Sequence, residues 1–149
     1  MIIACTSTFY NDLIQLSKKI KDLYSNCLQD ILLEFEGKST AEIALMGDQL
    51  NREIIPPNSS FKKIRIKNSL RNEGSSGGFR LMLLCLIVDD TIILLHVYPK
   101  TGRLLGEDPK QKGRIKLIEE MIAENGDYYI LDKDDKIFKK SDHIDPIIE

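Results

Sequence analysis

The sequence has no tryptophan, only two histidines, and no apolar run long enough to cross a membrane. A bilayer span needs about 18 or more consecutive apolar residues, and the longest run here, Leu81–Val88, has the length of a strand. Two histidines, His96 and His143, without paired cysteines argue against a zinc site. No basic segment precedes the apolar residues Ile2–Cys5, so the start is not typical of a signal peptide. We therefore expect a cytoplasmic protein without membrane association, metal or cofactor.

Cysteine is also scarce. Cys5, Cys27 and Cys85 are far apart, odd in number and flanked by apolar residues. Disulfide frameworks belong to oxidising compartments and normally use an even number of cysteines. The sequence thus predicts three reduced cysteines in the core.

The length and composition suit one folded domain. The chain has 149 residues, of which 42% are hydrophobic and 30% charged, enough to bury a core and too apolar for wholesale disorder. We assign residues 1–126 to the main domain and residues 127–149 to a C-terminal extension, in which Tyr128–Leu131 and Ile137-Phe138 suggest a short hairpin.

Hydrophobic periodicity predicts an α+β fold. A strand at Ile2–Cys5 is followed by helical spacing of apolar residues from Ser7 to near Gly37. The further predicted elements, in order, are a short helix at Ala41–Glu53, strands at Phe61–Lys67, Phe79–Val88 and Ile92–Val97, and a helix at Arg114–Asn125.

Charge is distributed unevenly along the chain. Residues 61–103 hold eight Lys and Arg against three Asp and Glu, a net charge of +5, whereas the rest holds 13 basic and 20 acidic residues, a net charge of −7. A basic stripe on an acidic protein is what binding to a polyanion requires, although a solvated strand surface gives the same pattern.

Two motif-like stretches are set aside. Gly74–Gly78 matches the G-x-S-x-G hydrolase pattern around Ser76, but that motif needs a strand before the serine and a helix after it, and here a strand follows. The acidic run Asp132–Asp135 lacks the glycine and closing glutamate of a calcium loop, so it is read as a solvated turn.

The candidate site combines Arg80, at the start of the central strand, with His96, Tyr98 and Lys100, at alternate positions of the next. A three-residue loop, Asp89–Thr91, would pair Val88 with Ile92, set Arg80 opposite Lys100 and bring all four side chains to one face. A two-residue Asp-Asp turn would shift the register by one residue and move Arg80 to the other face. We favour the longer loop because Asp-Asp lacks the glycine that tight turns prefer.

Each of these residues also has a purely structural interpretation. His96 would be a core histidine, Tyr98 would pack, and Arg80 would form a salt bridge. The strand before Arg80 adds three cations on alternate positions, Lys63, Arg65 and Lys67. So many cations together are harder to explain without an anion.

Three stretches carry a resemblance to a known family. They are Lys63-Ile64-Arg65, the Ser-Gly-Gly-Phe-Arg-Leu run at Ser76–Leu81, and the Ile-Leu-Leu-His-Val-Tyr-Pro-Lys run at Ile93–Lys100. They resemble the RelE/ParE toxin superfamily, most closely its RelE and HigB branches. The likeness is good over about residues 61–103, rests on element order alone over residues 1–60, and is absent after about residue 126.

The resemblance implies a fold and a site. The fold would be an N-terminal strand and a helical hairpin packed on a small antiparallel sheet, with a C-terminal helix. Arg80 matches the family's arginine that contacts the scissile phosphate, and His96 and Tyr98 fall where members carry residues for proton transfer or base stacking. The expected RNA-binding set comprises Lys63, Arg65, Lys67, Lys100 and Arg103.

The resemblance also implies an activity: a toxin of a type II toxin–antitoxin pair, cutting mRNA on the ribosome and neutralised by a cognate antitoxin protein. The superfamily signature does not separate mRNA from DNA gyrase as the target. A ParE-like gyrase inhibitor would use the same fold without needing His96 or Tyr98, and a catalytically degenerate member would act only as a binding module.

Overall fold

A computed structural model describes residues 1–19, 25–71, 77–100 and 109–140 of the chain. Over these residues the protein is α+β, with one seven-stranded sheet in the order β2-β3-β4-β5-β1-β6-β7. The strands are β1 (Ile2–Cys5), β2 (Asp48–Gln49), β3 (Ser59–Ile66), β4 (Phe79–Leu86), β5 (Thr91–Pro99), β6 (Tyr129–Asp132) and β7 (Ile137–Lys140). All neighbouring strands are antiparallel except β1 and β5, which are parallel.

The described helices are α1 (Ser7–Lys19), α3 (Cys27–Phe35), α4 (Thr40–Ile43) and α6 (Gln111–Glu124), with a 3₁₀ turn, η1 (Arg52–Ile54). In this described part of the chain, no helix has both the length and the apolar character that a bilayer crossing demands.

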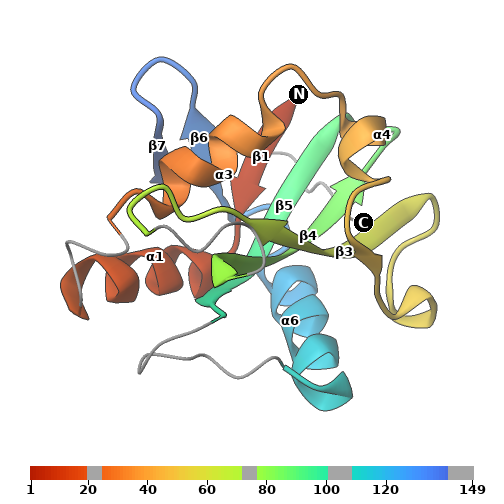
Figure 1. Ribbon diagram of the computed structural model, residues 1–149. Helices are drawn as coiled ribbons and strands as arrows, with labels where there is room; N and C mark the ends of the chain where they lie inside the picture. Colours follow the sequence, from red (N-terminus) through yellow and green to blue (C-terminus); the bar gives the residue numbers. More distant parts are fainter. Residues whose placement is uncertain (20–24, 72–76, 101–108, 141–149) are drawn as a thin grey trace.

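The helices lie on both faces of the sheet (Figure 1). Apolar residues of α1, α3 and α4 pack against one face, here called the first face. The second face packs against Leu117, Ile118 and Met121 of α6. Every residue of β4 is buried, as the apolar run in the sequence predicts for a central strand.

The helical pattern between Ser7 and Gly37 belongs to two helices rather than one. α1 ends at Lys19 and α3 begins at Cys27. The apolar spacing continues from one to the other because both helices bury the same side of the molecule, the first face of the sheet.

The predicted helix at Ala41–Glu53 is largely wrong. Only α4 is α-helical, and a capping box between Ser39 and Glu42 starts it, while η1 forms a 3₁₀ turn at the far end of the predicted range. Gly47 then takes a positive φ of 61°, and a Cβ atom at this position would lie 2.2 Å from the carbonyl oxygen of Lys63. This close approach of two backbones lets the chain pair with β3 as β2.

We expect Gly47→Ala to destabilise the protein more than Gly37→Ala. Both glycines have a positive φ, which costs an alanine about 1–3 kcal/mol, but a Cβ at Gly37 meets nothing within 4 Å. Urea unfolding of the two variants measures the difference. Equal losses of unfolding free energy would show that the contact with Lys63 has no energetic weight.

The C-terminal hairpin extends the sheet beyond β1. β6 pairs with β1 and β7 with β6, and Phe138 meets Phe9 of α1 edge-to-face at 6.0 Å between ring centroids. At the other edge, β2 adds a further strand. The expectation of a small sheet is therefore wrong, because short segments far apart in the chain join it at both edges.

The acidic turn between β6 and β7 satisfies its own polar groups. Asp132 Oδ1 accepts hydrogen bonds from the backbone N–H groups of Asp134 and Asp135, each at 3.0 Å. The bond from Asp135, followed by contact with Lys139, holds the pKa of Asp132 below its usual value. The turn is a hydrogen-bonded hairpin connection, as expected for a solvated loop.

Candidate functional site

The candidate site lies on the second face of the sheet, where two cross-strand rows of side chains meet. In one row Arg80 of β4 stands between Arg65 of β3 and Tyr98 of β5. In the adjacent row Met82 stands between Lys63 and His96. Side chains of directly paired residues lie on the same face, so three cations, the histidine and the tyrosine form one patch.

A β-bulge on β5 creates this arrangement. On either side of a four-residue turn, Leu86 pairs with Thr91. If this register continued along both strands, Arg80 would pair with Val97. The register shifts between Met82 and Leu83, leaving Leu95 of β5 as the extra residue, and Arg80 then pairs with Tyr98.

Both loop alternatives drawn from the sequence are therefore wrong in detail. The connection spans residues 87–90, and Arg80 faces Tyr98 rather than Lys100. Of the four side chains expected on one face, Arg80, Tyr98 and His96 do share it, but through the bulge rather than through the expected loop, and Lys100 follows the end of β5.

His96 is held by a carboxylate from α1. Its Nδ1 lies 2.7 Å from Asp12 Oδ2, and this oxygen also accepts a hydrogen bond from the backbone N–H of Val97 at 3.1 Å. The side chains of His96 and Asp12 are 20% and 22% exposed. The His96 ring stacks on Tyr98 with centroids 5.3 Å apart. The imidazole is thus fixed at one edge and open to solvent in part.

Several contacts fix α1 beside this end of β5. β1 pairs with β5 only as far as Leu94, so α1 takes over the strand's edge beyond that residue. The backbone N–H of Thr6 donates a hydrogen bond to the carbonyl oxygen of Leu94 at 3.1 Å, and its hydroxyl donates one to the carbonyl oxygen of Leu95 at 3.5 Å. Glu124 of α6 accepts one from the Ser7 N–H at 3.1 Å. A carboxylate at a helix N-terminus also interacts favourably with the helix dipole.

Arg80 and Arg65 form a like-charge pair. Arg80 is 6% exposed, and its Nη1 donates a hydrogen bond to the carbonyl oxygen of Phe79 at 3.2 Å. Guanidinium groups are suited to phosphate because of their forked geometry, so this pair is a candidate contact for a phosphate group.

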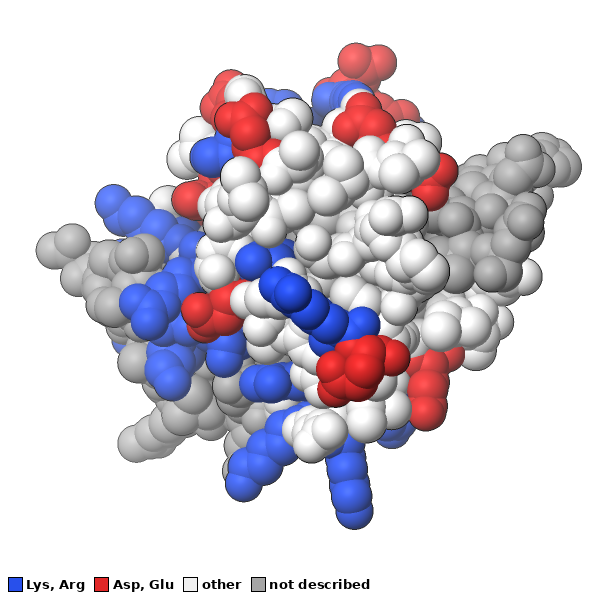
Figure 2. Space-filling view, turned by 90° about the vertical axis from the view of Figure 1, so that its right-hand side faces the viewer, with Lys and Arg blue, Asp and Glu red and all other residues white. Residues whose placement is uncertain are grey.

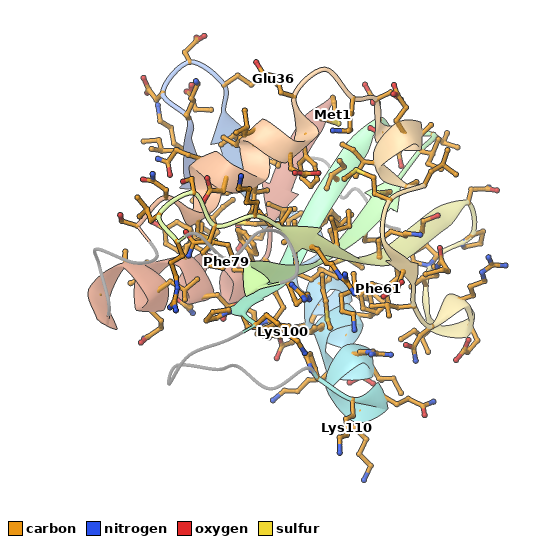
Figure 3. The ribbon with its side chains drawn as sticks, in the orientation of Figure 1. Met1, Glu36, Phe61, Phe79, Lys100 and Lys110 are labelled. Carbon is orange, nitrogen blue, oxygen red and sulfur yellow. The ribbon has the colours of Figure 1, made fainter. Side chains whose placement is uncertain are left out.

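The remaining predicted cations surround the patch or lie apart from it. Lys67 follows the end of β3 and is exposed. Lys100 is exposed at the end of β5, between Phe79 and Lys110 in the view of Figure 3. Arg103 lies outside the described residues, as does Ser76 of the rejected hydrolase pattern. Lys62 is buried on the first face, away from the site.

Lysine and arginine side chains gather in one part of the face that Figure 2 shows. Figure 2 shows them most densely along the left and lower part of the view, with single acidic residues among them. A positive surface of this kind attracts a polyanion before any specific contact forms.

The cysteines are not nucleophiles in this fold. All three are free and buried, as the sequence predicts. Burial raises the pKa of Cys85 to about 12, against a smaller opposite effect of Lys62, and it raises the pKa values of Cys5 and Cys27 as well. The reactive thiolate is therefore scarce near neutral pH.

Asp12 is a residue of the site that no sequence motif indicated. Its signal is present, because Phe9, Asp12 and Leu16 are spaced for one side of a helix, and Asp12 is the acidic residue between two buried apolar ones. An acid in an apolar stripe indicates a buried partner, but only the fold identifies it as His96.

Comparisons with protein-family models, with curated proteins and with solved structures found no match to this chain. Among the residues that the structure describes, no three His, Cys, Asp or Glu side chains are grouped in a way that could hold a metal ion. The function is therefore argued from the patch itself.

Proposed function

We propose that this protein is the toxin of a type II toxin–antitoxin pair, a ribosome-dependent mRNA endoribonuclease of the RelE/ParE superfamily that a cognate antitoxin neutralises. The observation that carries the proposal is the row Arg65–Arg80–Tyr98 beside His96 on one sheet face. The elements β1, α1, α3, β3, β4, β5 and α6 follow the order of the fold that the sequence resemblance implies, although α4 and β2 lie between α3 and β3 and the sheet is larger than that fold implies.

The patch supplies the groups that RNA self-cleavage needs. His96 accepts the proton of the 2′-hydroxyl, whose oxygen bonds to the neighbouring phosphorus while the bond from phosphorus to the 5′-oxygen breaks. Arg80 stabilises the negative charge on the pentacoordinate phosphate. The leaving 5′-oxygen takes a proton from water. The products are a 2′,3′-cyclic phosphate and a 5′-hydroxyl end.

The other residues hold the substrate or support His96. Lys63, Arg65 and Lys67 bind the phosphates of the splayed mRNA. Lys100, which is exposed at the end of β5, extends this set. All of these phosphate contacts are electrostatic, so affinity depends on salt. Tyr98, which is only 4% exposed, packs on the His96 ring and supports it.

Mapping of mRNA 5′ ends after induced expression tests the proposal. We expect new 5′-hydroxyl ends within the coding region of a reporter, and none in a matched reporter whose start codon is removed. Cuts in both reporters would refute ribosome dependence. An unchanged pattern of ends in both would refute the nuclease.

We expect Lys63→Gln with Lys67→Gln to flatten the salt dependence of RNA binding. Each phosphate contact on a single strand contributes about 0.7 to the slope of log K against log salt, so the double variant loses about 1.4. Fluorescence anisotropy at several salt concentrations gives the slope.

The matched control replaces Lys133 and Lys136, which are exposed in the β6–β7 turn. It removes the same charge from another part of the surface and should keep the parental slope. A slope that is the same in both double variants would mean that Lys63 and Lys67 do not face phosphate.

A further inference from the structure

We infer that Asp12 is a positioning residue for His96, fixing the imidazole with its proton on Nδ1 so that Nε2 is the nitrogen that accepts the substrate proton. This inference rests on the proposed function. It adds to that function a residue of α1 that none of the sequence motifs contains.

The geometry supports one tautomer. Asp12 Oδ2 lies 2.7 Å from His96 Nδ1 and accepts the Val97 N–H at 3.1 Å. An ionised carboxylate has no proton to donate, so Nδ1 must carry the hydrogen of this contact. The bond made by one ring nitrogen sets the state of the other. In neutral His96, Nε2 therefore keeps its lone pair.

Asp12 is itself held in place. The Val97 N–H anchors the carboxylate to the edge of β5, where the pairing with β1 has ended. On the other side of the histidine, Tyr98 stacks on the ring. The imidazole is thus held between α1 and the row that contains Arg80, and it reaches the scissile bond without first reorienting.

Within the site, Asp12 acts on the substrate only through His96. His96 exchanges the proton. In the described part of the chain, Asp12 forms hydrogen bonds to His96 and to the backbone N–H of Val97. Loss of Asp12 should consequently slow the chemical step and leave RNA affinity unchanged. A residue that orients a functional histidine typically contributes a factor of about 10–100 to activity.

Asp12→Ala tests the inference, with Asp30→Ala as the matched control. Asp30 is a buried aspartate of α3 that accepts the backbone N–H of Ser69 at 3.0 Å. It makes the same kind of backbone contact as Asp12 but lies in another helix. Thermal unfolding of both variants measures the cost of losing a hydrogen-bonded carboxylate, partly exposed in Asp12 and buried in Asp30.

The first readout needs no activity. Long-range ¹H–¹⁵N NMR spectra report which ring nitrogen carries the proton, and a His143→Gln background leaves His96 as the one histidine to assign. We expect the Nδ1–H form in the parent and in Asp30→Ala, and the Nε2–H form in Asp12→Ala. The Nε2–H form in the parent, or an unchanged tautomer in Asp12→Ala, would overturn the inference.

The second readout is mRNA cleavage on purified ribosomes. We expect kcat to fall about 10–100-fold in Asp12→Ala with KM unchanged, and Asp30→Ala to keep the parental kcat. Equal losses in the two variants would assign Asp12 a structural role and overturn its part in catalysis. A parent that cleaves no mRNA refutes the proposed function and with it that catalytic part, while the NMR spectra still decide the tautomer.

Discussion

Arg80→Ala is expected to lower mRNA cleavage by about 10²–10³-fold and to abolish toxicity. The reason is the loss of the donor that stabilises charge on the phosphate in the transition state. Arg80 stands in the middle of the row, with Arg65 on one side and Tyr98 on the other. Single-turnover cleavage on ribosomes and growth after induction measure the effect.

Packing must be separated from chemistry in this test, because Arg80 is only 6% exposed. Lys62→Ala is the matched control: Lys62 is equally buried, lies in the neighbouring strand and points to the first face. It should lose comparable packing yet keep the parental rate. Arg80→Lys keeps a charge but loses the guanidinium fork, so its rate should fall between those of Arg80→Ala and the parent.

The growth assay also separates the two explanations. A folded Arg80→Ala protein as toxic as the parent would remove the main support for a phosphate site in this patch. Loss of toxicity in both Arg80→Ala and Lys62→Ala would instead assign the effect to the fold.

His96→Gln is expected to reduce cleavage by about 10²–10⁴-fold, the usual contribution of a general acid or base. Glutamine retains an N–H that can reach Asp12 but does not exchange a proton near neutral pH. Binding to an RNA with a 2′-deoxy nucleotide at the cleavage site should stay near the parental affinity. The ratio of cleavage loss to binding loss is the decisive quantity.

The same variant separates a nuclease from a gyrase inhibitor. An inhibitor that only binds has no need of proton transfer, so folded His96→Gln would remain toxic. If parental expression changes no mRNA 5′ end while gyrase supercoiling stops, the nuclease proposal is wrong and the ParE-like alternative replaces it. Parental cleavage rates in folded His96→Gln would instead exclude His96 as the proton carrier.

Much of the architecture follows from local patterns in the sequence. Alternation in β3 buries Ile64 and Ile66 and leaves Arg65 exposed, because successive side chains of a strand point to opposite faces. The unbroken apolar run of β4 requires cover on both faces. α6 ends at Glu124, followed by Asn125 in the left-handed conformation and Gly126 with a φ of 91°, as the glycine predicts.

Features that depend on distant segments were not readable in this way. The sheet gains β2 because Gly47 lets one backbone approach another, and it gains β6 and β7 through pairing with β1. Local propensity says nothing about which edge a short strand will join, since hydrogen bonding to the neighbouring strand decides it.

The sequence by itself indicated Arg80, His96 and Tyr98 as candidates, because residue type sets which groups a side chain donates or accepts and which charge it carries, but it did not indicate Asp12. Only the tertiary structure decided how they meet. The bulge at Leu95 brings Tyr98 opposite Arg80, and a strand's period of two gives no sign of an inserted residue. Asp12 and His96 are 84 positions apart, and their contact exists because α1 takes the edge of β5 that β1 leaves open.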